Sequence, residues 1–263
     1  MNNTVIKTLD ILNLLSVHTE ALSLSQISRL LDIPKSTAFD ILHTLESRNF
    51  VTMSDSRLHL YRLGAETFRI GYAYLQETGL DSIARPILSE LRTATDETVF
   101  LASYTGGQSM TYTMKFLSSS EYQAVFNTGD SRPLLSFALG KAVLSAYEDE
   151  RVFRIMNGYD YRQCSVSTIT DFESLIAFLR AARQRGYVVD STQENIQLAS
   201  PVAAPLLDAG NHVIGAISIV VMNNPDSPAR VREMGELVSR TALDISRGLG
   251  YQGKSLFARS FIH

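Results

Sequence analysis

The chain has 263 residues, 45% of them hydrophobic and 19% charged, so it fits one large or two ordinary globular domains and excludes a disordered chain. Its single cysteine, Cys164, excludes a disulfide within the chain and predicts a reducing compartment. The net charge is −3, and there is neither a signal-peptide pattern nor a long uncharged apolar run, so we expect a cytoplasmic protein without a membrane span.

The first clear pattern lies in Thr4–Leu15, where apolar residues recur at helical spacing and predict a first helix. Its expected buried stripe consists of Val5, Leu9 and Leu12, widened by Ile11, Leu14 and Leu15. Ser23 and Gln26 then have the spacing of a capping box and predict the start of a second helix. Pro34 fits the first position of a third helix, because its missing N–H would be unpaired there.

The third predicted helix, Lys35–Ser47, opens on small polar and cationic residues and divides into two faces at 100° per residue. The inward face holds Ala38, Ile41, Leu42 and Leu45, and the outward face holds Ser36, Phe39, Asp40, His43 and Ser47. Two strands, Phe50–Met53 and Leu58–Leu63, follow around a turn. Three helices and a hairpin indicate a winged helix-turn-helix, whose third helix would present its N-terminal turn to DNA phosphates.

The charge of this first region does not by itself favour DNA. Residues 1–64 contain six Lys and Arg against six Asp and Glu, so their net charge is zero. Nucleic-acid binders usually have a basic balance. A winged helix that docks onto protein instead of DNA therefore stays open as an alternative.

Beyond residue 64, helices and strands follow one another in a pattern typical of an α+β fold. Helices are predicted over Ala65–Gln76, Asp81–Thr95, Pro133–Tyr147 and Asp149–Asn157, from Thr170 to a stop at Gly186, and after Pro228. Strands are predicted over Thr98–Thr105 and Gln108–Phe116 as a hairpin, over Glu121–Asn127, and over "YVVD", "PVAAPLLD" and "HVIGAISIVV". Thr170 and Glu173 have capping-box spacing. The expected result is a mostly antiparallel sheet flanked by helices.

Motifs for catalysis, metals and nucleotides are sparse. No His-x-x-x-His pair, Cys–His cluster or glycine-rich nucleotide loop occurs, so we expect neither a metal nor a cofactor. The turn "TGDSRP" resembles the nucleophile turn of some esterases, but no Asp-x-x-His near the C-terminus supplies the base. A small serine hydrolase that uses Ser131 or Ser218, with an appended winged helix, is the alternative to a regulator.

Several spaced motifs together resemble the IclR family of bacterial transcription regulators. "IPKST" followed by "LHTLESRNFV" resembles the recognition helix and its exit, and "YRLG" resembles the end of the wing. "GDSRPLLSFALGKAVL" has the spacing of a family stretch, here Gly129, Pro133, Ala138, Gly140, Lys141 and Ala142. "RGYVVD" and "PVAAPLLDAGNHVIGAISI" resemble the core of the effector domain.

This resemblance covers essentially the whole chain. It implies a winged helix-turn-helix over residues 1–64, a linker helix over residues 65–79 and a GAF-like effector domain over residues 80–263. It also implies a homodimer, often paired into a tetramer, that binds a palindromic DNA operator and has no enzymatic activity. We expect a repressor whose DNA binding is modulated by a small metabolite, either an organic acid or an aromatic compound.

The resemblance and the helical wheel assign site residues. DNA contacts fall to Ser25, Gln26, Lys35, Ser36, Thr37, Phe39, Asp40, His43 and Arg57. Effector positions map onto Val125, Ala138, Leu139, Asp190, Pro201, Ser218 and Val220, with Ser200 as a neighbouring donor. Asp40 stands where many relatives have Arg, and it can accept from cytosine N4. Pro201 and Val220 replace a usual Cys and Ser, so we expect a larger or less polar ligand.

Overall fold

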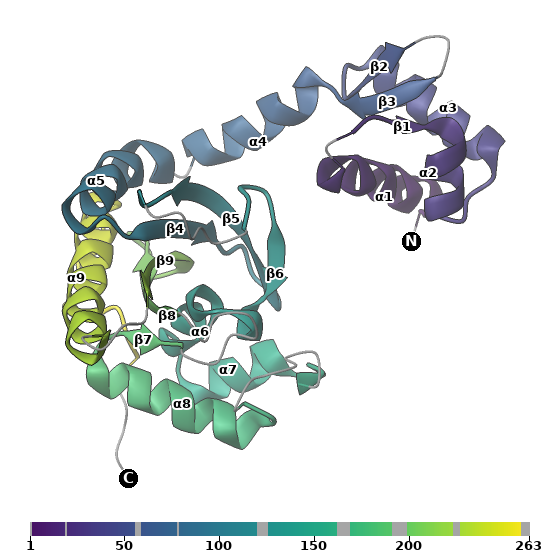
Figure 1. The fold of residues 1–263 in the computed structure, drawn as a ribbon. Helices are drawn as coiled ribbons and strands as arrows, with labels where there is room; N and C mark the ends of the chain where they lie inside the picture. Colours follow the sequence, from purple (N-terminus) through teal and green to yellow (C-terminus); the bar gives the residue numbers. More distant parts are fainter. Residues whose placement is uncertain are drawn as a thin grey trace. The chain divides into compact units, whose positions relative to one another are not determined.

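The structure is a computed structural model, and it describes residues 2–18, 20–55, 59–77, 79–119, 126–161, 169–190, 199–222 and 227–258. The chain divides into two compact units, Met1–Gly79 and Leu80–His263. The helices and strands of both units are labelled in Figure 1. Each unit buries its own hydrophobic core, so each can be described by itself.

The first unit is a winged helix-turn-helix, as the sequence predicts. Its elements are α1 (Asn3–Val17), β1 (Leu22–Ser23), α2 (Leu24–Leu30), α3 (Lys35–Ser47), β2 (Val51–Asp55), β3 (Leu60–Leu63) and α4 (Ala65–Glu77). The three strands form an antiparallel sheet in the order β1-β3-β2. The two-residue strand β1 is too short for a period-2 pattern, and sequence reasoning missed it.

Local signals decide where the helices of the first unit begin. The Ser23 side chain accepts from the Gln26 N–H, and the Gln26 side chain accepts from the Ser23 N–H, so the predicted capping box is confirmed. Pro34 occupies the N-cap of α3 and not the first helical position. Its backbone is extended there, and α3 begins at Lys35.

The predicted stripe on α1 is wrong in part. Ile11 and Leu15 are buried, but Val5 and Leu9 are 52% and 54% exposed. Only the later turns of α1 meet the core of the first unit, so helical spacing alone placed the stripe too close to the N-terminus. An apolar surface therefore remains open on the first turns of α1.

The second unit is an α+β domain with a six-stranded sheet. Its elements are α5 (Leu80–Thr95), β4 (Thr98–Ser103), β5 (Ser109–Phe116), β6 (Ser131–Pro133), a 3-10 helix (Leu134–Ser136), α6 (Ala138–Ser145), α7 (Asp149–Met156), α8 (Phe172–Arg185), β7 (Val188–Val189), β8 (Ala199–Leu207), β9 (Val213–Met222) and α9 (Ser227–Gly248). The strand order is β6-β5-β4-β9-β8-β7, and all described pairs are antiparallel.

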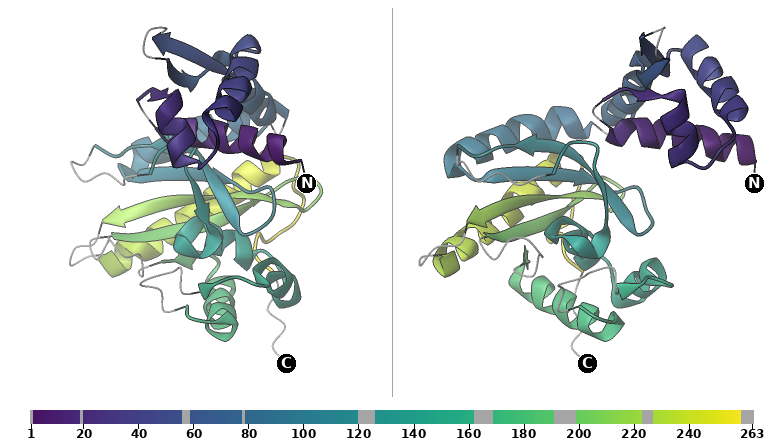
Figure 2. Two further views of the ribbon diagram at one scale, coloured as in Figure 1. Left: turned by 90° about the vertical axis from the view of Figure 1, so that its right-hand side faces the viewer. Right: turned by 45° about the vertical axis from the view of Figure 1, so that its right-hand side comes forward.

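Helices cover both faces of this sheet. Figures 1 and 2 show α5 and α9 side by side on one face and α6 on the other, with α8 beyond it. All residues of β4 and β8 are buried, which fits their mostly apolar sequences without a period-2 alternation.

Three sequence predictions in the second unit need correction. The single helix expected over Pro133–Tyr147 is a strand, a 3-10 turn and α6, because the turn folds back onto α6 where Gly140 meets the Leu134 backbone. The capping box of α8 uses Asp171 and Ser174, one residue after the predicted pair. The strand expected over 121–127 lies mostly outside the described residues, and Phe126 and Asn127 are not in a strand.

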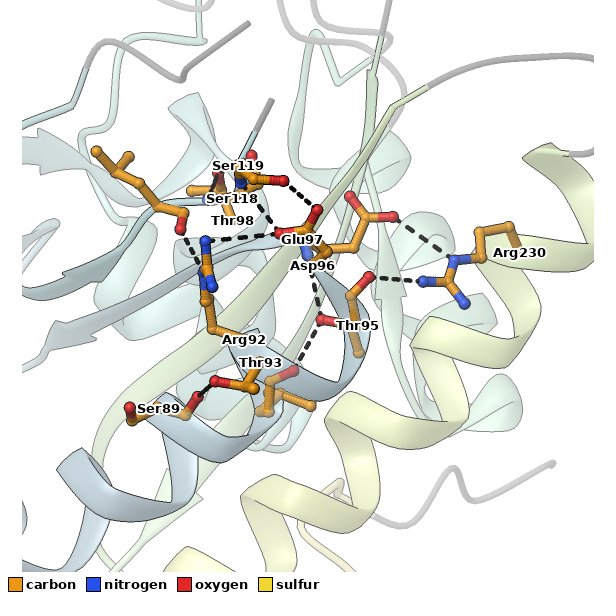
Figure 3. A network of polar contacts seen from close by, with 12 residues as sticks. Ser89, Arg92, Thr93, Thr95, Asp96, Glu97, Thr98, Ser118, Ser119 and Arg230 are labelled. Carbon is orange, nitrogen blue, oxygen red and sulfur yellow. Dashed lines mark hydrogen bonds and ion pairs between the residues drawn. The ribbon is translucent and has the colours of Figure 1, made fainter. Parts of the chain in front are cut away.

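A polar network joins the end of α5 to the sheet and to α9 (Figure 3). Arg230 of α9 donates to the Thr95 carbonyl at 3.0 Å and lies 3.5 Å from the Glu97 carboxylate. Asp96 accepts from the Ser119 N–H at 3.0 Å, and Arg92 lies 3.5 Å from Asp96. Burial raises the pKa of Glu97 despite the opposing effect of Arg230. These contacts connect the C-terminal end of α5 to α9 and to the segment that follows β5.

Candidate functional sites

The outward face of α3 is the candidate nucleic-acid interface. Ala38, Ile41, Leu42 and Leu45 are buried and Ser36, Phe39, Asp40, His43 and Ser47 are exposed, so both faces of the predicted wheel are confirmed. Lys35 is also exposed, and Thr37 is half-buried. Within the described ranges neither Lys35 nor Asp40 forms an ion pair, so both charges face solvent.

The start of α3 is open to an anion. No side chain caps its N-terminus, because the N-cap residue is Pro34. The N–H groups of the first turn then carry the positive end of the helix dipole without a side-chain acceptor. Lys35 and Ser36 stand beside these N–H groups, and such a helix start suits a phosphate.

The rings of Phe39 and His43 stack on each other on this face. Their ring centroids lie 6.1 Å apart with an interplanar angle of 23°. They are four residues apart, so they project from successive turns of the same helix face. Phe39 remains 44% exposed, and the stack restrains its ring without burying it.

The structure gives less support to the other predicted DNA contacts. Ser25 and Gln26 are exposed at the start of α2, but the Gln26 amide oxygen is engaged in the capping box. The wing consists of β2 and β3, with a register shift between Met53 and Asp55. Arg57 lies outside the described residues.

Strand register brings three of the predicted effector positions onto one face of the second sheet. Pro201 pairs with Val220, and Ala203 pairs with Ser218 across β8 and β9. Directly opposite residues project to the same face, so Pro201, Ser218 and Val220 lie together. Ser200 pairs with Val221 and alternates to the other face. Val125 lies outside the described residues.

The buried helix α6 begins on this same face. Its N-cap residue is Phe137, whose ring stacks on Tyr112 at 5.3 Å, and Tyr112 packs edge to face on Phe100 at 5.3 Å. Phe100 pairs with Ser218, so this chain of contacts links α6 to the Ser218 face. Ala138 and Leu139 form the first turn of α6, and no side chain caps it.

The Ser218 hydroxyl is the most informative polar group of this face. Ser218 is 3% exposed, and no residue in the described ranges forms a hydrogen bond with its side chain. A buried hydroxyl without a partner costs about 1–3 kcal/mol. Buried polar groups are nearly always paired, so a Ser218 hydroxyl without a partner among the described residues makes this sheet face a candidate place for a ligand.

Aromatic side chains border the start of α6. Tyr112 lies between Phe126 and Phe137, with ring centroids 5.1 Å and 5.3 Å away, and Phe100 packs edge to face against both Tyr112 and Phe126. Burial raises the pKa of the Tyr112 phenol well above its ordinary value.

Asp190 does not act as an isolated carboxylate. Lys141 of α6 donates to its Oδ2 at 2.7 Å, and the two side chains are 2% and 0% exposed. The Lys141 ammonium also lies 5.6 Å from the ring centroid of Phe178 on α8. Because Lys141 balances the charge of Asp190, an anionic ligand nearby would meet no net negative charge from this pair. Sequence reasoning quoted Lys141 in a motif but missed this pairing.

Other chemistry finds little support in the described part of the chain. Ser131 lies exposed on the edge strand β6 and is 3.5 Å from the Met110 carbonyl. No group of three metal-ligating side chains occurs among the described residues. None of the described helices is long and apolar enough to cross a membrane.

Comparisons with known proteins cover both units. The model of the "IclR helix-turn-helix domain" matches residues 4–54, and that of "Bacterial transcriptional regulator IclR C-terminal" matches residues 72–247. The "HTH-type transcriptional repressor AllR" of Salmonella paratyphi A is 32% identical over 228 residues, which cover 87% of this chain and 83% of that protein. AllR of Escherichia coli K12 matches over the same shares at the same identity.

Solved structures share the fold. The Thermotoga maritima IclR structure matches with a TM-score of 0.73 and 25% identity, over 95% of this chain and 99% of that one. An IclR homolog from Microbacterium hydrocarbonoxydans, complexed with 4-hydroxybenzoate, matches with a TM-score of 0.74 and 20% identity. That match covers 94% of this chain and 99% of the other.

Proposed function

Because the chain belongs to the IclR family of bacterial transcriptional regulators, we propose that it is a repressor whose operator binding responds to a small molecule held in its second unit. Its relatives are named as transcriptional repressors, which favours repression over activation. The serine hydrolase alternative finds no support, since members of this family are regulators and not enzymes.

The DNA-binding part of the proposal places α3 in the major groove. Its open N-terminal turn would contact phosphates, and its outward side chains would reach base edges. A homodimer would place two copies of α3 in successive major grooves, about 34 Å apart or a multiple of that, on a palindromic operator. The protein-docking alternative would leave this exposed face and the uncapped helix start unexplained.

Exposed apolar surfaces in the first unit support the homodimer. Val5 and Leu9 on α1 are more than half exposed, and Phe68 on α4 is 72% exposed and stacks on Tyr72 at 5.7 Å. Exposed apolar side chains that gather on one helix are a common feature of interfaces. A second copy of the chain is the proposed occupant, and pairing of dimers into a tetramer is the further possibility.

The effector part of the proposal rests on the buried Ser218 hydroxyl, which has no partner among the described residues. A small molecule between the sheet and the start of α6 would accept a hydrogen bond from Ser218 and meet the first-turn N–H groups of Ala138 and Leu139. The positive end of the helix favours a carboxylate. The neighbouring rings favour a planar body, as in the 4-hydroxybenzoate named for the Microbacterium homolog. We therefore propose an aromatic carboxylate as the ligand class.

Two linked assays test the two parts of the proposal. DNA duplexes are first selected from a random library with the full-length protein. Thermal shift assays then compare benzoate and its hydroxylated derivatives with glyoxylate and pyruvate, because a ligand that binds the folded state raises the melting temperature. An aromatic carboxylate should stabilise the protein and release the selected duplex. Selection of no duplex would contradict DNA binding, and stabilisation by the small oxo acids alone would contradict the aromatic class.

A further inference from the structure

The outward face of α3 combines side chains with very different chemistry. Phe39 offers an apolar ring that cannot form a conventional hydrogen bond, and the adjacent Asp40 offers only acceptors. Both are exposed, and both lie on the second turn of the helix, where an α3 docked by its N-terminal half reaches base edges. These two residues, and not the phosphate-binding start of α3, would then decide which sequence is preferred.

The Phe39 ring is positioned before any DNA arrives. His43 stacks against it at 6.1 Å between centroids, and the exposed fraction of Phe39 is still 44%. An isolated exposed phenylalanine needs no explanation, but this one is restrained by a neighbour and stands on a recognition face. In the major groove the C5 methyl group of thymine is the one apolar feature that distinguishes a base.

The Asp40 carboxylate limits its own partners. It repels phosphate and cannot donate to the O6 and N7 acceptors of guanine. Its preferred partner is the exocyclic N4 amine of cytosine. No described residue neutralises Asp40 by an ion pair, so a base that offers only acceptors in the groove would leave its charge uncompensated.

We propose that Phe39 contacts the C5 methyl group of a thymine and that Asp40 accepts from the N4 amine of a neighbouring cytosine, so that α3 selects a step containing these two pyrimidines. His43 is the positioning residue that holds the Phe39 ring. This inference rests on the proposed operator binding and adds the bases that are read. The zero net charge of residues 1–64 fits it, because specificity then depends on base contacts more than on general attraction to phosphate.

The test begins with duplexes selected from a random library by the full-length wild-type protein. The aligned sequences should contain an invariant thymine next to a cytosine in each half-site. That thymine is then replaced by deoxyuridine, which removes only the methyl group. The wild-type protein should lose about fourfold in affinity, since burying one methyl group is worth roughly that factor. Fluorescence anisotropy with labelled duplexes measures both dissociation constants.

A double-mutant cycle isolates the Phe39 contact. With Phe39→Ala the thymine and deoxyuridine duplexes should bind equally, and with His43→Ala the penalty for deoxyuridine should fall between those of wild type and Phe39→Ala. Phe153→Ala is the matched control, because Phe153 is an exposed phenylalanine (56%) of the second unit. It should keep the full penalty. Thermal melting of each variant verifies that the first unit is folded.

Asp40→Asn tests the second base in a new selection. Asparagine pairs with adenine in the major groove, so the preferred cytosine should change to adenine. Failure to select any motif would contradict the proposed operator binding itself. A motif with no penalty for deoxyuridine, or with the same penalty in wild type and Phe39→Ala, would contradict the thymine contact alone. An unchanged preference in Asp40→Asn would contradict the cytosine contact.

Discussion

Two helices of this protein, α3 in the first unit and α6 in the second, begin in the same way but lie in opposite environments. Neither has a side-chain cap at its N-terminus, since Pro34 and Phe137 occupy the cap positions. The first turn of α3 is largely exposed, whereas all eight residues of α6 are buried. The same unpaired N–H groups therefore suit a large external polyanion at α3 and a small enclosed ligand at α6.

Each of the two helices also contains one lysine, and the two lysines differ in exposure and in partners. Lys35 is exposed at the start of α3 without a described ion pair, and Lys141 is buried in α6 against Asp190. An exposed lysine near DNA contributes through counterion release. The buried Lys141 instead contributes by neutralising the charge of the buried Asp190 carboxylate. The environment, and not the residue type, separates a binding role from a structural role.

The largest expected effect is loss of stability in Lys141→Met. Removing the ammonium leaves the Asp190 carboxylate buried without its cation, which costs about 3–5 kcal/mol of unfolding free energy. Urea denaturation followed by circular dichroism measures it. The matched control Lys35→Met should stay within about 0.5 kcal/mol of wild type. Adding Asp190→Asn to Lys141→Met should recover part of the loss, and no recovery would contradict the pairing.

The next effect concerns the proposed ligand. Ser218→Ala should weaken binding of a confirmed aromatic carboxylate by a factor of about 2 to 13, the equivalent of about 0.5–1.5 kcal/mol. The affinity of the ligand-free protein for its selected duplex should not change. Isothermal titration calorimetry gives the ligand dissociation constant. Ser109→Ala, at an exposed position of β5, is the control, and an equal loss in both variants would place the ligand elsewhere.

A smaller effect is expected when the phosphate contact of α3 is removed. Lys35→Ala should weaken binding to selected and unrelated duplexes alike. It should also reduce the slope of log affinity against log salt by about one unit per copy of α3 in contact. Anisotropy titrations at several salt concentrations, from about 50 mM to about 200 mM, give this slope. A change in sequence preference with the same slope would instead place Lys35 on a base.

The smallest expected effect is on the second unit when the first is removed. A fragment of residues 80–263 should fold by itself, because its hydrophobic core is complete within the unit. Its melting temperature should match that of the second unit in the full chain. Limited proteolysis of the full chain should cut first near α4, the proposed linker helix. Rapid degradation of the purified fragment would contradict the independence of the two units.

The tertiary structure changed several expectations for one physical reason. Helical spacing marked Val5 and Leu9 as buried, but only contact with the rest of the first unit decides which turns of α1 are covered. Pro133–Tyr147 read as one helix, and the close approach of Gly140 to Leu134 divides it. Burial depends on what packs from elsewhere in the chain, and a local pattern does not contain that information.

The sequence by itself determined the winged helix-turn-helix, the two faces of α3 and the Ser23 capping box, because these depend on residues within one or two turns of each other. It also determined the family, through motifs spread along the chain. Only the tertiary structure joined Lys141 to Asp190, assembled four aromatic rings at the start of α6 and left the Ser218 hydroxyl without a partner among the described residues. These features depend on strand register and on contacts between segments that are distant in the sequence. Both are determined only when the whole core packs.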